Sequence, residues 1–147
     1  MFQYKIDKPN RIDLPFGKIQ KQNAGETLYG FIDNKQASDI EERFYRGLVN
    51  TKRTDQILFL YPIISPRSMP GMLEVDFLVS SGAYLYVFQV DGEIAHKGVS
   101  KQQDDARKDV IVNEFFKKYN AFPVKRIPGI FLNNQEQANQ TVRELIR

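Results

Sequence analysis

Residues 73–96, LEVDFLVSSGAYLYVFQVDGEIAH, decide the fold because two strand-like runs lie here on either side of a short serine and glycine turn. Both runs, EVDFLV and YLYVFQVDG, are dominated by aromatic and β-branched residues. Residues two apart along a strand share a face, so Gln89 and Asp91 lie on one side of the second run. Asp76 lies within the first run. We therefore expect oxygen-bearing side chains to converge across a hairpin.

Segments before and after this hairpin extend it into a sheet. Residues 56–64, QILFLYPII, form a continuous apolar run of strand length, which predicts a strand buried on both faces. Short connections between the three successive runs predict an antiparallel meander. Residues 121–129, AFPVKRIPG, supply one further predicted strand.

Three helices are predicted around the strands. Ser38 and Asp39 are each followed three residues later by a glutamate, Glu41 and Glu42, which is the capping-box pattern, so a helix begins near residue 38. A second helix is predicted from about residue 101 to residue 119, and a third over residues 136–147. The resulting order, α-β-β-β-α-β-α, predicts the α/β class. The expected face of the second helix carries Asp104, Lys108, Ile111, Val112, Phe115 and Tyr119.

The length and composition fit one domain with a sizeable core, since 41% of the 147 residues are hydrophobic. We expect a single domain over residues 38–147, preceded by an N-terminal arm over residues 1–37. The arm mixes prolines, lysines and amide side chains, and no fold can be assigned to it. A solvated extension packed on the domain is the preferred interpretation. Nucleic-acid contact, or assembly into a homodimer or larger complex, is the alternative.

Charge and cysteine content limit the partners and the compartment. The net charge of +3, from 21 Lys and Arg against 18 Asp and Glu, permits a polyanionic partner without indicating one. No stretch approaches about 18 consecutive apolar residues, and the N-terminus lacks the apolar core of a signal peptide, so neither a membrane nor secretion is expected. The chain has no cysteine, which excludes disulfides and thiolate zinc sites and fits a reducing compartment. We expect a cytoplasmic protein.

Asp76, Gln89 and the backbone carbonyl of Val90 are the candidate ligands of a metal ion. A carboxylate inside an apolar strand costs desolvation energy unless it meets a partner, and clustered oxygen atoms suit a hard cation such as Mg²⁺. A bound Mg²⁺ would lower the pKa of a water and neutralise charge on a phosphate. The alternative is that Asp76 and Gln89 are only polar residues on a half-exposed strand face.

Two further residues could complete such a site. Glu41 is expected at the border of the apolar face of its helix while Glu42 points away, so Glu41 could add a carboxylate; its alternative role is capping the first turn. His96 is the only histidine, which excludes a multi-histidine zinc site. It suits proton transfer at neutral pH, and the alternative is a solvated loop residue.

The motifs together resemble the PD-(D/E)xK nuclease superfamily, in particular its branch related to very-short-patch-repair endonucleases. The resemblance covers about residues 38–128 in matching order. It implies a restriction-endonuclease-like fold with a mixed β-sheet flanked by helices and the core order α-β-β-β-α-β. It also implies Mg²⁺, with Mn²⁺ as a substitute, and cleavage of phosphodiester bonds in DNA. The matching motifs are Glu41 on its helix, VDF at 75–77, QVDG at 89–92, His96, Asp104-x-x-Arg107 and PVKRI at 123–127.

The candidate site that results has three groups of residues. The candidate catalytic residues are Glu41, Asp76, Gln89, Asp91, His96 and Lys101. The candidate metal ligands are Asp76, Gln89 and Val90. The candidates for phosphate or DNA contact are Arg67, Lys97, Lys101 and Arg107.

This chain departs from the family pattern at two positions. Gln89 stands where a carboxylate is usual, which removes a negative charge and is expected to lower metal affinity. Asp91 replaces the superfamily lysine, so a cation beside the attacking water must come from Lys97, Lys101 or Arg107, or be absent. We therefore expect a magnesium-dependent DNA endonuclease or nickase, with a catalytically inactive DNA-binding or assembly module on the same fold as the alternative. An unrelated small-molecule-binding α/β domain is a third hypothesis that little in the sequence favours.

Overall fold

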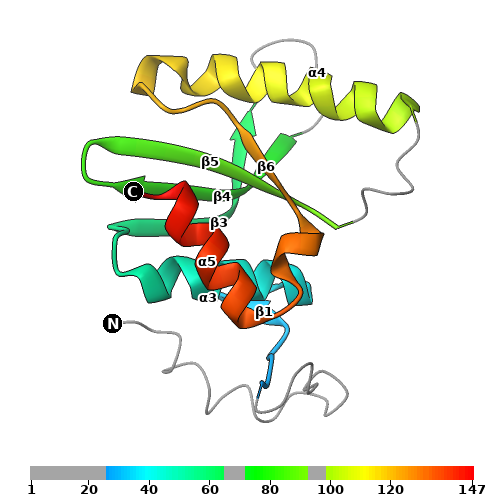
Figure 1. Cartoon of the computed structure of the whole chain (residues 1–147). Helices are drawn as coiled ribbons and strands as arrows, with labels where there is room; N and C mark the ends of the chain where they lie inside the picture. Colours follow the sequence, from blue (N-terminus) through cyan, green and yellow to red (C-terminus); the bar gives the residue numbers. More distant parts are fainter. Residues whose placement is uncertain (1–25, 65–71, 93–98) are drawn as a thin grey trace. The chain divides into compact units, whose positions relative to one another are not determined.

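The computed structural model describes residues 26–64, 72–92 and 99–147 of the chain (Figure 1). The chain divides into two compact units. We name them the helical unit, which comprises residues up to 53 and residues 130–147, and the sheet unit, which comprises residues 54–129. The main elements follow the predicted order, with a short hairpin before them.

The sheet unit is built on a four-stranded mixed sheet, which confirms the predicted α/β class. Its strands are β3 (Gln56–Ile64), β4 (Met72–Ser81), β5 (Tyr84–Asp91) and β6 (Lys125–Pro128), in that spatial order. The first three pair antiparallel, so the predicted meander is confirmed. The last strand joins β5 in parallel after a crossover through a helix.

The crossover helix α4 (Val99–Phe116) continues into a short 3-10 turn, η2 (Lys117–Tyr119). Figure 1 shows α4 running along one face of the sheet. Val112 and Phe116 of this helix are buried, 1% and 4% exposed. Removing their side chains and those of the facing strands from water is the main force that holds α4 on the sheet. The core cluster consists of Ile63, Val75, Leu78, Val87, Val112 and Phe116.

The inward face of α4 is turned by one residue position from the predicted face. Tyr119, expected on the buried face, is 53% exposed, and Phe116 is buried instead of its neighbour Phe115, which is only partly buried. Two adjacent phenylalanines allow two apolar faces about 100° apart, because each residue turns an α-helix by that angle. Contact with the sheet selects the face through Phe116.

The helical unit pairs α3 (Asp39–Thr51) with α5 (Gln135–Leu145), which lie side by side in Figure 1. The predicted capping box is confirmed: the Ser38 side chain accepts a hydrogen bond from the Glu41 N–H, and the Glu41 side chain accepts one from the Ser38 N–H. Gly47 allows the helices to approach closely. A Cβ atom there would lie 3.0 Å from Val142 Cγ2 and 3.2 Å from the Ala138 carbonyl oxygen.

The described part of the expected N-terminal arm, residues 26–37, belongs to the helical unit. Strands β1 (Phe31–Ile32) and β2 (Lys35–Gln36) form a two-stranded antiparallel hairpin. Leu28 and Ile32 are 1% and 2% exposed, so this segment contributes to the core. The 3-10 helix η3 (Gly129–Leu132) leads into the segment before α5. Within the described ranges, no helix is long and apolar enough to cross a membrane.

Candidate functional site

The sheet is interrupted at Asp76, in the middle of strand β4. Strands β3 and β4 pair on both sides of Leu60 and Asp76. These two residues face each other in the register but do not form a backbone pair. The β4–β5 ladder ends one residue later in β4, at the pair Phe77 and Phe88. Leu60 has a φ of 55°, a left-handed conformation that costs a branched residue on the order of 1–3 kcal/mol. Backbone strain at Leu60 in β3 therefore lies opposite the broken pairing at Asp76 in β4.

Side chains bridge β4 and β5 where the backbone ladder stops. The Val90 N–H donates a hydrogen bond to Asp76 Oδ2 at 2.8 Å, and the Asp76 N–H donates one to Gln89 Oε1 at 3.0 Å. The Gln89 amide also approaches the Glu74 carbonyl oxygen at 3.5 Å. The structure thus places Asp76, Gln89 and Val90 next to one another, and the group of Val90 that contacts Asp76 is its N–H, whereas the predicted ligand is its carbonyl oxygen.

Asp91, two residues beyond Gln89 on the same strand face, forms an ion pair with Arg126. Arg126 Nη1 donates to Asp91 Oδ1 at 2.9 Å, and the rest of the guanidinium group donates to both oxygens of Asp109 at 2.7 and 2.9 Å. Asp105 contributes a longer approach of 3.9 Å. One strand-β6 arginine therefore joins the end of β5 to two aspartates of α4. We call these four residues the arginine cluster.

Electrostatics keep Arg126 charged under all ordinary conditions. Its hydrogen bonds to Asp109 raise the pKa of the guanidinium group, and the charges of Asp109, Asp91 and Asp105 raise it further, while partial burial opposes them. The four residues of the cluster comprise three carboxylates and one guanidinium group. Gln89 and Arg126 are paired neighbours across the parallel strands.

The prediction that Glu42 points away from the protein interior is wrong, whereas the capping role considered for Glu41 is confirmed. Glu42, expected to point away, is completely buried, and it accepts hydrogen bonds from the N–H groups of Tyr29 and Gly30. Arg46 Nη2 donates to it at 2.7 Å. Glu41 is occupied in the capping box instead. The prediction failed because residues 26–37, treated as peripheral, cover the side of α3 that was expected to face solvent.

The other predicted residues are placed as follows. Arg107 is exposed on α4 and forms the expected i, i+3 ion pair with Asp104, at 3.3 Å. Lys101 lies near the beginning of α4. Arg67, His96 and Lys97 lie outside the described residues. Glu41 belongs to the helical unit, whereas Asp76 belongs to the sheet unit.

Arg126 and its aspartates on α4 were not predicted from the sequence. The signal was present, because Asp105 and Asp109 continue the spacing of the buried residues Val112 and Phe116 along one helix face. In β6, Arg126 alternates with the buried Ile127, so its side chain must leave the sheet on the opposite side.

Arg126→Met is expected to lower the free energy of unfolding by about 2 kcal/mol, because it leaves neighbouring carboxylates without their cation. The effect is smaller than for a fully buried pair, since the Arg126 side chain is 25% exposed. Arg107→Met is the matched control, and its side chain is 66% exposed. Urea denaturation should show a change within about 0.5 kcal/mol for the control. Equal effects of the two substitutions would show that the arginine cluster has no special role.

Comparisons of the chain with known proteins identified no relative. No family model, no curated protein and no solved structure matches the chain. Fold class and site geometry therefore rest on the chain itself.

Proposed function

We propose that the chain is a magnesium-dependent DNA endonuclease or nickase with a restriction-endonuclease-like fold, centred on Asp76 and acting in the cytoplasm. The observation that supports this most is the interruption of the sheet at Asp76, where a carboxylate and the Gln89 amide oxygen meet across two strands. Strained backbone gathers at functional sites, and Leu60 lies opposite Asp76. Asp91 and Arg126 add a charged border to the same end of β5.

The oxygen donors present suit magnesium. A carboxylate, a side-chain amide and a backbone carbonyl are hard ligands, and Mg²⁺ typically takes only one or two protein carboxylates and fills its other positions with water and phosphate. Asp76 would be the charged ligand, with Gln89 and Val90 as neutral ones. Among the residues that the structure describes, no group of three or more His, Cys, Asp or Glu side chains is arranged to hold a metal ion. The proposed site therefore depends on a single carboxylate.

Magnesium or manganese, when bound, would supply charge neutralisation at a phosphodiester and a water of lowered pKa. The protein residues have positioning roles that need no metal. The Val90 N–H donates to the Asp76 carboxylate and orients it, and the Asp76 N–H donates to the Gln89 side-chain oxygen and orients that group. Arg126 fixes the end of β5 through Asp91. Contact with DNA phosphates is assigned to Arg67, Lys97, Lys101 and Arg107, and proton transfer to His96.

The alternative is a catalytically inactive DNA-binding or assembly module. One observation favours it: the polar groups of the site already have structural partners. Asp76 and Gln89 accept hydrogen bonds from backbone N–H groups, and Asp91 is paired with Arg126. In this alternative, these side chains only close the gap between β4 and β5.

Cleavage of supercoiled plasmid separates the two functions. The purified chain is incubated with plasmid and either Mg²⁺, Mn²⁺ or a chelator, and nicked and linear products are resolved by electrophoresis. The proposal expects nicked or linear DNA with either metal and none with the chelator. Absence of cleavage on duplex, single-stranded and branched DNA with both metals would favour the binding module.

A further inference from the structure

A row of stacked aromatic rings crosses the sheet unit and ends at its surface. The Tyr84 and Phe122 rings stack with centroids 5.4 Å apart, and Phe122 lies 5.0 Å from the Tyr86 ring. Tyr86 in turn stacks on Phe88 at 5.6 Å. Because alternate residues of β5 share a face, these rings project away from Val87, which packs in the α4 core. We call this row the aromatic ladder.

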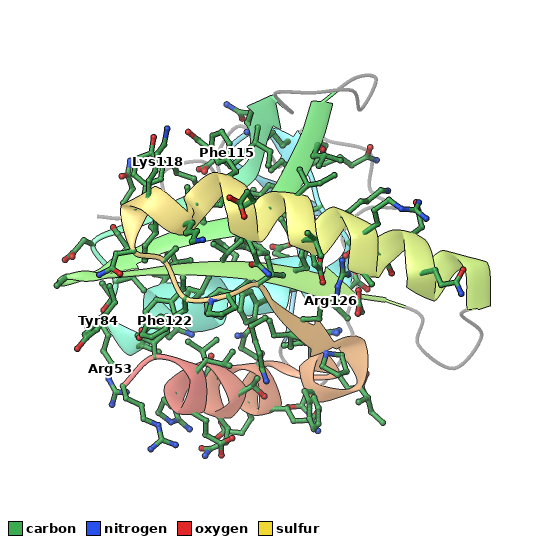
Figure 2. All side chains as sticks on the ribbon, turned by 90° about the horizontal axis from the view of Figure 1, so that it is seen from above. Arg53, Tyr84, Phe115, Lys118, Phe122 and Arg126 are labelled. Atoms are coloured by element: carbon green, nitrogen blue, oxygen red, sulfur yellow. The ribbon has the colours of Figure 1, made fainter. Side chains whose placement is uncertain are left out.

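The outer end of the aromatic ladder is open to solvent. Tyr84 is 55% exposed and Phe122 is 45% exposed, whereas Phe88, at the inner end, is 1% exposed. Figure 2 shows Tyr84 and Phe122 beside each other, at the opposite end of β5 from Arg126. The Phe122 N–H donates to the Leu85 carbonyl oxygen at 2.9 Å, which fixes the loop against the strand. The exposed rings are therefore held in place before any partner binds.

The segment that carries Phe122 is basic, and Asp55 lies at the neighbouring turn between β4 and β5, where it accepts a hydrogen bond from the Gly82 N–H. Residues 115–135 include Lys117, Lys118 and Lys125 but neither Asp nor Glu. Lys125 is paired with Phe88 across the parallel strands, so its side chain leaves the sheet on the face of the aromatic ladder. Lys118 lies toward the same end of the sheet unit as Tyr84 (Figure 2). In the part of the chain that the structure describes, none of the three lysines forms an ion pair.

We propose that the outer end of the aromatic ladder binds unpaired nucleotides of single-stranded nucleic acid. Exposed rings offer a stacking surface that any base can use, and neighbouring lysines contact the phosphates. Bases inside a duplex are already stacked on one another and cannot reach Tyr84 or Phe122. A hydrophobic protein partner does not account for three unpaired lysines, whereas a phosphate backbone matches their charge.

This inference concerns binding and does not depend on a metal at Asp76. Only its extension to catalysis, in which a single-stranded segment guides DNA to the site, rests on the proposed function. Tyr84 begins β5 and Gln89 lies near its end, so the outer end of the aromatic ladder and Gln89 of the candidate metal site lie toward opposite ends of one strand and on opposite faces of the sheet.

Fluorescence anisotropy of labelled oligothymidine with the full chain, in the presence of a chelator, tests the binding. Tyr84→Ala and Phe122→Ala are each expected to weaken affinity at least about fivefold, the lower limit for loss of one base stacked on an aromatic ring. Phe131→Ala is the matched control, because Phe131 is an exposed aromatic of the helical unit. Its affinity should equal that of the unmodified chain. Equal losses in all three variants, or no loss at Tyr84 and Phe122, would overturn the proposal.

A second variant gives a direct signal of stacking. The chain contains no tryptophan, so Tyr84→Trp introduces a single indole fluorophore. Oligothymidine should quench its fluorescence, whereas a matched abasic oligomer, which has phosphates but no bases, should not. Quenching by both oligomers, or by neither, would contradict base stacking. Oligouridine should bind as well if the surface binds single strands of both DNA and RNA. A preference for duplex DNA over both oligomers would overturn the proposal.

The phosphate contacts have their own readout. For single strands, the slope of log affinity against log salt concentration becomes shallower by about 0.7 for each phosphate contact that is removed. Lys125→Gln and Lys118→Gln should each reduce the slope by about that amount, and an unchanged slope would contradict the assigned contacts. Asp76→Asn should retain oligothymidine binding, so a failure of the nuclease proposal leaves this test intact.

Discussion

Glu42→Ala is expected to lower the free energy of unfolding by about 3–5 kcal/mol, because the partly buried Arg46 guanidinium group and two partly buried N–H groups lose the carboxylate to which they donate. The Glu42 carboxylate is completely buried, and Arg46 Nη2 lies 2.7 Å from it. The N–H groups of Tyr29 and Gly30 donate to the same carboxylate at 2.7 to 3.0 Å. A loss of this size is a large part of the 5–15 kcal/mol typical of a folded domain.

Glu41→Ala is the matched control, one residue away on the same helix turn. It removes only one half of the capping box, whose loss costs about 1 kcal/mol. Urea denaturation followed by circular dichroism measures both variants, provided that the transition is two-state. A smaller effect for Glu42→Ala than for Glu41→Ala would contradict the burial of Glu42 and the role of residues 26–37 in the helical unit.

Asp76→Asn is expected to reduce metal-dependent cleavage at least about a hundredfold, while the fold is retained. Loss of an indirect metal partner commonly costs 10- to 100-fold, and loss of the only charged ligand should cost more. The asparagine keeps one side-chain oxygen in the same place, so it can still accept the hydrogen bond from the Val90 N–H. Initial rates of plasmid nicking at saturating Mg²⁺ measure the effect.

Asp55→Asn supplies the control for this substitution. Asp55 lies in the same unit, and its side chain also accepts a hydrogen bond from a backbone N–H group, that of Gly82, at 2.8 Å. Unlike Asp76, it is exposed and lies far along the sequence from Gln89. Its cleavage rate should remain unchanged. Equal rates for Asp76→Asn and the unmodified chain would remove Asp76 from the reaction, and equal losses in both aspartate variants would indicate a general effect of charge.

The sequence predicted most of the secondary structure for identifiable reasons. The two runs on either side of the turn near residues 80–84 are rich in β-branched and aromatic residues, so their antiparallel pairing was recognisable. The Ser38 and Glu41 spacing located the beginning of α3, because capping depends on adjacent side chains and not on tertiary contacts. The proximity of Asp76 and Gln89 followed from the same hairpin.

Features that depend on contacts between distant segments were not predictable in the same way. Glu42 is buried because residues 26–37 fold onto α3, and no local pattern shows which side of a helix a preceding segment will cover. The face of α4 was ambiguous because Phe115 and Phe116 are adjacent. Arg126 meets aspartates 17 and 35 residues away, and only the crossover between β5 and β6 brings them together.

Calorimetric titration of Mg²⁺ into the unmodified chain, Gln89→Glu and Asp76→Asn tests the proposed metal site most directly. Gln89→Glu keeps the side-chain oxygen that accepts a hydrogen bond from the Asp76 N–H, and it adds a negative charge to the site. We predict saturable binding to the unmodified chain, tighter binding to Gln89→Glu and no saturable binding to Asp76→Asn. Absence of saturable binding to the unmodified chain, or an affinity that neither substitution changes, would contradict a metal site at Asp76 and Gln89.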